Sequence, residues 1–203
     1  MLVKVCGIQT REAAEVVVQE GADFIGFVFA ESKRKISPEQ ATEIASGLPN
    51  QVKKVGVFVN EKPERMVEIA NQVGLDYLQL HGDEPAEVAR KLPFGVIKAF
   101  SADSINLENI HDYPCDYYLI DSPAGKYRGG SGKTFNWELI EELKLDRSKL
   151  ILAGGLTVEN VQQAIKVVHP IGVDVSSGVE TNGEKDVLKI KQFIKNAKEG
   201  DRK

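Results

Sequence analysis

The chain contains 203 residues, of which 42% are hydrophobic and 28% are charged, and its formal net charge is −4. This length and composition suit one domain with a sizeable buried core, so we expect residues 1–203 to form a single domain. The negative net charge gives no overall positive potential that would attract nucleic acid. No apolar run approaches the roughly eighteen residues that a membrane span needs. Nucleic-acid binding and membrane insertion are therefore excluded.

The two cysteines, Cys6 and Cys115, lack the spacing of metal ligands, and no apolar leader segment follows Met1. Secreted proteins and zinc proteins usually carry such features. We therefore expect a cytoplasmic protein that contains no metal site.

The first part of the chain predicts a strand, a helix and a second strand. Residues 2–6 form a short apolar strand, and Thr10 begins a helix that Gly21 ends. The expected buried face of this helix consists of Ala13, Ala14, Val17 and Val18. Residues 22–29 are almost continuously apolar, which is typical of a strand covered on both faces in a parallel sheet.

The middle of the chain continues this alternation. Ser37 and Gln40 predict a capping box, with Pro38 as the first residue of the helix. Pro63 is expected to begin another helix, and Glu84 a further one that ends near residue 92. The predicted strands of this part cover residues 55–59, 75–80, 96–100 and 117–120. A sparse apolar pattern predicts a helix over residues 101–112.

Residues 122–134 form the one long irregular stretch, and it is rich in glycine. Its Gly-Lys-Thr ending suggests a nucleotide-binding loop, but the P-loop pattern requires glycine where Tyr127 stands. Glycine-rich loops of this length in compact domains often cover a site, so we interpret the segment as a cover, with a plain linker as the alternative. A short helix over residues 137–143 is expected to follow.

Two turns near the C-terminus have the features of a phosphate site. The apolar strand at residues 150–153 ends in two glycines, and Thr157 is placed to cap a helix over residues 157–168. The apolar strand at residues 172–175 ends in two serines and a glycine. Free backbone N–H groups and hydroxyls attract anions, so the pair of turns favours a phosphate over two tight connections. The candidate phosphate-binding residues are Gly154, Gly155, Ser176, Ser177 and Gly178.

A last amphipathic helix over residues 186–197 completes eight strand and helix units. Its expected inward residues are Val187, Leu188, Ile190, Phe193 and Ile194. Eight units predict an α/β fold, a single (βα)8 TIM barrel with its phosphate site at the loops after strands seven and eight. The alternative is an open doubly wound sheet, which usually has about five or six strands and a glycine fingerprint after the first. Here residues 6–10 read Cys-Gly-Ile-Gln-Thr instead.

The functional face of such a barrel lies at the carboxyl ends of the strands. The residues that the predicted strands and their loops bring there are Cys6, Ser32, Lys33, Arg34, Lys35, Asn60, Gln79, His81, Asp83, Lys98, Ser101, Asp121 and Asp174. From the residues alone, structural roles stay open: a lone buried cysteine is usually a small hydrophobe, and an aspartate can cap a turn.

Eight segments at these strand ends match one known family in order along the whole chain. They are Lys4-Val-Cys-Gly-Ile8, Gly26-Phe-Val-Phe29 with Ser32-Lys-Arg34, Val55-Gly-Val-Phe-Val-Asn60, Leu78-Gln-Leu-His-Gly82, Leu119-Ile-Asp121, Gly129-Gly-Ser-Gly-Lys-Thr-Phe135, Ala153-Gly-Gly155 and Asp174-Val-Ser-Ser-Gly-Val179. The chain thereby resembles the phosphoribosylanthranilate isomerases. A cysteine after the first strand combined with an aspartate after the sixth is the most specific part of the resemblance.

The resemblance implies an enzyme of tryptophan biosynthesis, an intramolecular oxidoreductase of the aldose–ketose isomerase type. It would convert N-(5-phosphoribosyl)anthranilate to 1-(2-carboxyphenylamino)-1-deoxyribulose 5-phosphate by an Amadori rearrangement, without a cofactor. The resemblance assigns Cys6 as general base, Asp121 as general acid and Arg34 as the ligand of the anthranilate carboxylate. His81 and Asp174 are further candidates for substrate contact, and for His81 a structural hydrogen bond is the alternative. The expected partner is a small phosphorylated substrate, and the expected assembly is a monomer or a homodimer.

Both catalytic assignments run against ordinary pKa values. A free thiol has a pKa near 8.5 and costs about 2 kcal/mol to ionise at pH 7, whereas a free aspartic acid has a pKa near 3.9. The site must therefore change both groups. A cationic Schiff base, or Lys4 if it lies close, would favour the thiolate of Cys6, and burial would raise the pKa of Asp121.

Two other readings stay open. Indole-glycerol-phosphate synthases and histidine-pathway isomerases are also phosphate-binding barrels. The synthases have a lysine and glutamate pair where this chain has Cys6 and Asp121, and the histidine-pathway isomerases have an aspartate at the end of the first strand. Cys6 at that position speaks against both. A non-catalytic binder of a phosphorylated metabolite would keep the phosphate turns without needing Cys6 or Asp121.

Overall fold

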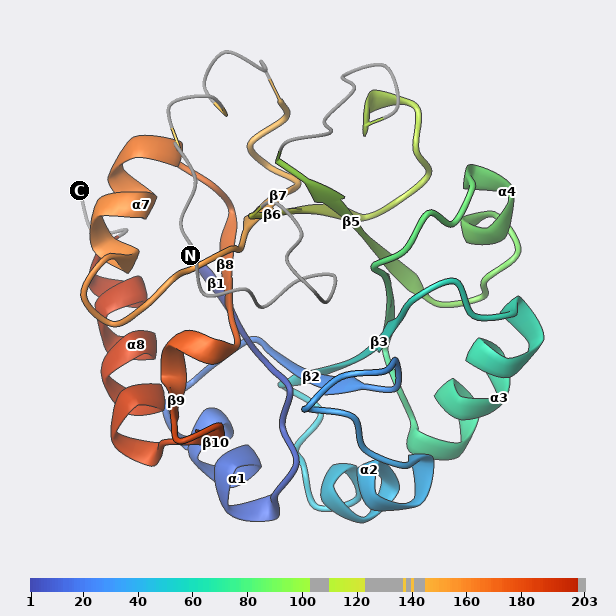
Figure 1. Cartoon of the computed structure of the whole chain (residues 1–203), viewed down its shortest axis with the longest axis horizontal. Helices are drawn as coiled ribbons and strands as arrows, with labels where there is room; N and C mark the ends of the chain where they lie inside the picture. Colours follow the sequence, from blue (N-terminus) through green and yellow to red (C-terminus); the bar gives the residue numbers. More distant parts are fainter. Residues whose placement is uncertain (103–109, 123–136, 138–139, 141–144, 201–203) are drawn as a thin grey trace.

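The computed structural model describes residues 1–102, 110–122, 137, 140 and 145–200. At its centre, eight parallel strands pair in sequence order and close into a barrel (Figure 1). The strands are β1 (Leu2–Cys6), β2 (Phe24–Val28), β3 (Lys53–Phe58), β4 (Tyr77–Leu80), β5 (Gly95–Ser101), β6 (Tyr117–Asp121), β7 (Leu150–Leu152) and β8 (Gly172–Val175). The predicted barrel architecture is therefore confirmed.

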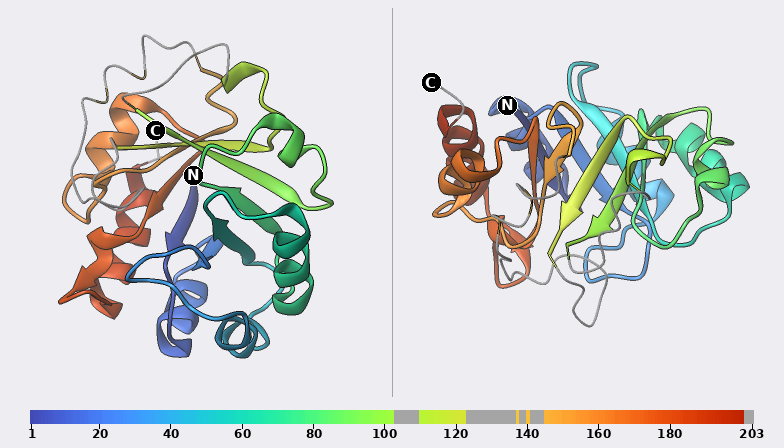
Figure 2. Two further views of the ribbon diagram at one scale, coloured as in Figure 1. Left: turned by 45° about the vertical axis from the view of Figure 1, so that its right-hand side comes forward. Right: turned by 90° about the horizontal axis from the view of Figure 1, so that it is seen from above.

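Helices pack along the outside of this barrel, as the side view in Figure 2 shows. The described helices are α1 (Arg11–Gln19), α2 (Pro38–Ala45), α3 (Pro63–Val73), α4 (Ala86–Ala89), α7 (Val161–Val168) and α8 (Val187–Gly200). Two predicted caps are confirmed, because Thr10 accepts from the Ala13 N–H and Ser37 forms a reciprocal capping box with Gln40. The predicted cap at Thr157 is wrong, since the residue before α7 is Asn160. No helix in the described part of the chain combines the length and apolar character of a membrane span.

Three predicted helix features are wrong. Helix α4 begins at Ala86 rather than Glu84, because the Glu84 side chain turns inward to the buried Lys98. Helix α7 begins at Val161, because residues 158–160 form a turn before it. Leu188 is 75% exposed, since the buried face of α8 repeats at the helical spacing of residues 190, 193, 194 and 197.

Three further predictions concern segments that lie wholly or largely outside the described residues. They are the helix over residues 101–112, the cover over residues 122–134 and the helix over residues 137–143. Beyond the prediction, the structure adds a 3-10 turn, η1 (Ser177–Val179), and a two-stranded hairpin of β9 (Glu180–Thr181) and β10 (Glu184–Lys185). This hairpin lies between β8 and α8 in the chain.

The barrel interior is filled by its own layer of side chains, separate from the larger core between strands and helices. The interior layer consists of Phe24, Val55, Ile97, Ala99, Leu119, Ile151 and Ala153. Cys6, Val28 and Val57 form a separate, smaller cluster of buried side chains. Because strand side chains alternate between two faces, Lys4 points to the same side as Cys6. Because side chains fill the barrel interior, we expect the pocket at the carboxyl ends of the strands, where sites in this fold lie.

Candidate active site

A cavity of about 770 Å³ is lined by residues from the carboxyl ends of the strands. The predicted site residues along its wall are Cys6, Arg34, His81, Asp121, Gly154, Gly155, Asp174, Ser176 and Ser177. Sites for small molecules commonly have volumes of about 300 to 1,000 Å³. The barrel therefore brings residues that are far apart in the sequence into one pocket of suitable size.

Cys6 lies at the end of β1, and the neighbouring strand makes room for its thiol. Gly26 is its partner residue on β2, and a Cβ atom at Gly26 would come within 2.9 Å of the Cys6 Sγ. Two residues earlier on β1, the ammonium of Lys4 lies 2.9 Å from the carboxylate of Asp174 on β8. Lys4 is only 1% exposed. The thiol thus shares its side of the barrel with a buried ion pair.

The buried surroundings of Cys6 oppose ionisation of the thiol. Burial and the negative charge of Asp174 raise the pKa of Cys6, while the positive charges of Lys4 and Lys185 act in the opposite direction. For Lys4, burial alone would lower the pKa, but the Asp174 carboxylate and Cys6 outweigh it and the pKa is raised. Lys4 therefore carries its positive charge beside a thiol that, in the free protein at neutral pH, keeps its proton.

Asp121 lies at the end of β6, and its two carboxylate oxygens have different neighbours. The Ser122 N–H donates to Oδ1 at 2.8 Å, and the Nε2 of His81 lies 3.4 Å from Oδ2. The Nε2 of Gln79 lies 2.8 Å from the Nδ1 of His81, so that Gln79 orients the imidazole ring. His81 therefore has a structural hydrogen bond and also faces the carboxylate in the pocket.

The two predicted phosphate turns meet at one side of the cavity. Gly154 and Gly155 have φ angles of +81° and +64°, a conformation that side chains rarely adopt. A Cβ atom at Gly178 would come within 1.9 Å of the carbonyl oxygen of Leu156, so the second turn packs directly against the first. Among the described residues, the backbone N–H groups of Gly155 and Ser177 find no acceptor. Both N–H groups are thus available to a ligand.

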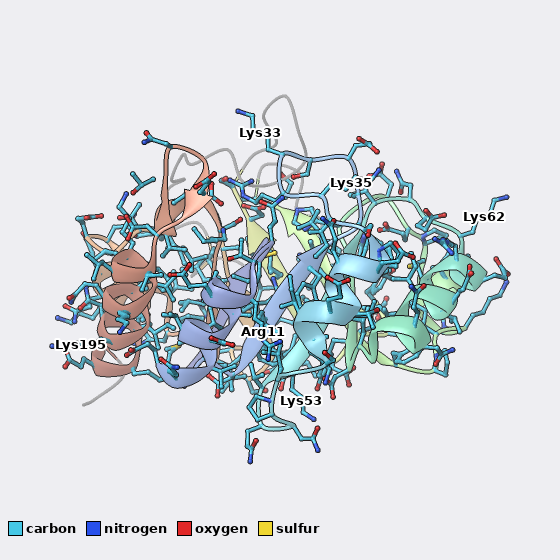
Figure 3. The ribbon with its side chains drawn as sticks, turned by 90° about the horizontal axis from the view of Figure 1, so that it is seen from below. Arg11, Lys33, Lys35, Lys53, Lys62 and Lys195 are labelled. Atoms are coloured by element: carbon cyan, nitrogen blue, oxygen red, sulfur yellow. The ribbon has the colours of Figure 1, made fainter. Side chains whose placement is uncertain are left out.

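Arg34 reaches the cavity from the loop after β2 and differs from the lysines beside it. Its side chain passes over Gly7, where a Cβ atom would come within 2.5 Å of the Arg34 Cδ. Lys33 and Lys35 are exposed, and Figure 3 shows both at the upper rim of the barrel, at the opposite end from Lys53. All three residues border the cavity, but Arg34 is partly buried there, whereas the two lysines are exposed at its rim.

The guanidinium of Arg34 is already bound on one edge by Glu180. Its Nε and Nη2 donate to the two carboxylate oxygens at 2.6 and 2.9 Å. Lys185 donates to the same carboxylate at 2.6 Å and to the Ser176 carbonyl at 2.9 Å. Burial would raise the pKa of Glu180, but the hydrogen bonds from Arg34 and Lys185 outweigh it and lower the pKa.

Some predicted residues do not reach the cavity. Lys98 is buried against the carboxylate of Glu84, at 2.8 Å, and also donates to the Gly82 carbonyl. The prediction that Lys98 is presented at the functional face is therefore wrong. Asn60 accepts from the Asp83 N–H at 2.8 Å and shapes the loop that leads to α4. These contacts hold the loop between β4 and α4.

Sequence reasoning missed Glu180 and Lys185. Their hairpin had a usable signal, because Asn182 and Gly183 have φ angles of +55° and +88°, and an Asn-Gly pair is the preferred two-residue turn between strands. Nothing local in the sequence predicted that Arg34 would pair with Glu180, 146 residues further along the chain.

The geometry defines a class of protein. It is a closed (βα)8 barrel whose polar pocket, at the carboxyl ends of the strands, contains a thiol, a carboxylate and two turns with free N–H groups. A family model described as "N-(5'phosphoribosyl)anthranilate (PRA) isomerase" matches residues 3–196. The chain therefore belongs to the phosphoribosylanthranilate isomerase family, and the resemblance inferred from its motifs is confirmed.

Individual relatives agree with this assignment. The chain is 53% identical, over 199 residues, to an N-(5'-phosphoribosyl)anthranilate isomerase of Listeria monocytogenes, covering 98% of each chain. Among solved structures, the phosphoribosyl anthranilate isomerase of Thermotoga maritima superposes with a TM-score of 0.87 at 48% identity, covering 98% of this chain and 100% of the other. Another solved relative, at 45% identity, a TM-score of 0.83 and the same coverage, is in complex with reduced 1-(o-carboxyphenylamino)-1-deoxyribulose 5-phosphate.

Proposed function

We propose that the chain, acting as one catalytic domain, isomerises N-(5-phosphoribosyl)anthranilate to 1-(2-carboxyphenylamino)-1-deoxyribulose 5-phosphate. The observation that supports this most strongly is that Cys6 and Asp121 line the same cavity as the glycine and serine turns. The relative bound to a reduced form of the product supports the substrate class. Whether the chain is a monomer or a homodimer stays a prediction, and a Thermotoga maritima relative is dimeric.

The substrate has two fixed charges, and the cavity offers donors for both. The backbone N–H groups of Gly155 and Ser177 would bind the phosphate, with Gly154, Ser176 and Gly178 shaping the two turns. Arg34 would bind the anthranilate carboxylate, because a planar guanidinium matches a carboxylate better than an ammonium does. The two contacts would fix the sugar between Cys6 and Asp121.

The reaction begins at the sugar ring. The protonated carboxyl of Asp121 donates its proton to the ring oxygen, the bond from that oxygen to C1 breaks, and the nitrogen lone pair forms a cationic Schiff base. The thiol of Cys6 then loses its proton to water, and the resulting thiolate removes the proton from C2, so that the electron pair of that bond forms the C1–C2 double bond of an enolamine. Asp121 takes up a proton from water, which restores both groups. Tautomerisation of the enolamine to the ketone gives the product.

The surroundings of Cys6 fit a base that is activated only with substrate bound. Burial raises the pKa of the thiol in the free protein, although Lys4 and Lys185 favour the thiolate. The Schiff base adds a positive charge next to the thiol, and an opposite charge at short range favours the ionised form. His81 would hold the Asp121 carboxyl in place through Oδ2, while Asp174 would keep Lys4 charged beside the thiol.

The direct test is turnover of freshly made phosphoribosylanthranilate by the purified chain, followed by identification of the product. We expect the aminoketose to form without added metal or cofactor. Tight binding of the reduced product analogue without any turnover would instead support the non-catalytic binder.

A further inference from the structure

Arg34, Glu180 and Lys185 form a cluster of charged side chains beside the cavity. Arg34 lines the cavity wall, whereas Glu180 and Lys185 are not part of that wall. The side chains of Arg34, Glu180 and Lys185 are 17%, 10% and 6% exposed. The three groups therefore form a largely dehydrated cluster, in which hydrogen bonds between charged groups are stronger than at the surface.

The geometry leaves only part of the guanidinium free. Glu180 occupies the edge formed by Nε and Nη2, and within the described residues Nη1 has no partner. A carboxylate in the cavity can therefore approach the end of the guanidinium formed by Nη1 and the second N–H of Nη2. A fixed fork of this kind selects planar carboxylates by direction as well as by charge.

The charges of the cluster allow Arg34 to accept a second carboxylate. Arg34 and Glu180 alone would be neutral, and a further anion would face little attraction. Lys185 stands directly opposite Glu180 in the β9–β10 pair and donates to the same carboxylate. Burial lowers the pKa of Lys185, while the Glu180 carboxylate favours its charged form. With Lys185 protonated, the cluster has a net charge of +1, the sum of two cations and one anion, and becomes neutral when a carboxylate binds.

The hairpin that carries Glu180 and Lys185 is fixed from several sides. The left-handed residues Asn182 and Gly183 form its turn. Asp186, which follows it, donates its N–H to the Val179 carbonyl and accepts from the N–H groups of Leu188 and Lys189 at the start of α8. Such a support can hold a guanidinium in one orientation before a ligand arrives, which reduces the entropic cost of binding.

We propose that Glu180 and Lys185 are positioning residues that set the selectivity of the site for a substrate with an aromatic carboxylate. Glu180 fixes the direction of the free end of Arg34, and Lys185 supplies the charge that makes this end attractive to a second anion. This inference rests on the proposed role of Arg34 in binding the anthranilate carboxylate.

The test compares two ligands by calorimetric titration. One is reduced 1-(o-carboxyphenylamino)-1-deoxyribulose 5-phosphate, and the other is the same compound with a phenyl group in place of the carboxyphenyl group. The ratio of their dissociation constants measures selectivity for the carboxylate. Equilibrium binding is preferable to turnover here, because Lys185 also affects the pKa of Cys6.

The variants are Glu180→Gln, Lys185→Met and the double variant, which has the same cluster charge as the parent. Loss of a hydrogen bond to a charged group typically changes an equilibrium by about tenfold or more. We expect each variant to lower the ratio about tenfold, with the phenyl ligand bound within about threefold of the parent. Unchanged binding of that ligand reports an intact fold.

Three results would overturn the inference. Selectivity that increases in Glu180→Gln, or that returns to the parent value in the double variant, would mean that only net charge matters. If the ratio is unchanged in all three variants but lower in Arg34→Lys, then Glu180 and Lys185 have no positioning role, although Arg34 still binds the carboxylate. An unchanged ratio in Arg34→Lys itself would refute the proposed carboxylate contact.

Discussion

The ammonium of Lys4 lies 2.9 Å from the carboxylate of Asp174 at the seam where β1 and β8 close the barrel, two residues before Cys6. The carboxylate keeps the lysine charged, and the lysine in turn favours the thiolate against the effect of burial. An ion pair between the first and last strands of the barrel thus also acts on the proposed catalytic base.

The first prediction concerns the thiol of Cys6. Lys4 lowers the pKa of this thiol, and Asp174 raises it by a smaller effect, so Lys4→Met combined with Asp174→Asn should raise the pKa further. The double change avoids leaving a buried carboxylate without its partner. The pH dependence of alkylation by iodoacetamide, in a Cys115→Ser background, should shift to higher pH. Lys53→Met, at an exposed residue of the opposite rim, is the control and should not shift it. A shift to lower pH would show that the charge of Asp174, and not that of Lys4, has the larger effect on the thiol.

The second prediction concerns the phosphate. Gly155→Asp should sharply weaken substrate binding, because it places a carboxylate against a dianion. Gly155→Asn is the matched control, since it has nearly the same shape without the charge, and asparagine tolerates a φ angle of +64° better than most residues. The difference in KM between the two variants isolates the charge. Equal KM values in two folded variants would show that the phosphate binds in another part of the cavity.

The third prediction concerns the loop after β2. Arg34→Lys should reduce kcat/KM more than Lys33→Ala or Lys35→Ala, because Arg34 has a planar fork of donors that is partly buried, whereas the two lysines are exposed at the cavity rim. The two lysines are exposed, so their loss should leave kcat/KM within about twofold of the parent, as is usual for surface charges. Equal losses in the three variants would count against the assignment of Arg34.

The fourth prediction concerns stability. Lys98 and Glu84 form a buried pair behind the pocket, at 5% and 2% side-chain exposure. Lys98→Met leaves the Glu84 carboxylate without its partner and should lower the free energy of unfolding by about 3 to 5 kcal/mol. Adding Glu84→Gln should recover part of this loss, and urea unfolding monitored by fluorescence measures both. A single variant as stable as the parent would mean that Glu84 is protonated or hydrated in the folded protein.

Hydrophobic pattern and turn chemistry predicted most of the barrel. The strands were predictable because they are buried on both faces, and the capping box at Ser37 and Gln40 was predictable because it is local. The start of α4 was missed because Glu84 is a good helix-starting residue by itself, and only the partner on β5 turns its side chain inward. Tertiary contacts of this kind have no local signal.

The candidate site likewise combines residues that local motifs predict with residues that only tertiary contacts bring into place. Cys6, Asp121 and the glycine turns follow from motifs at strand ends, and the structure brings them into one cavity. The supporting residues do not follow from motifs. Glu180 meets Arg34 only because β8 closes against β1 and carries the hairpin to the loop after β2. The sequence therefore predicts which residues meet the substrate better than it predicts which residues hold them.

The most direct test of the proposed mechanism is the turnover number of Cys6→Ser. Serine keeps the shape of the side chain, but its hydroxyl has a pKa far too high for it to serve as the base. A positioned base typically contributes about 10² to 10⁴-fold to the rate. We predict a loss of kcat in this range, with the dissociation constant of the reduced product analogue unchanged within about threefold, and a comparable result for Asp121→Asn. A Cys6→Ser variant that turns over within about tenfold of the parent would contradict the assignment of Cys6 as the base.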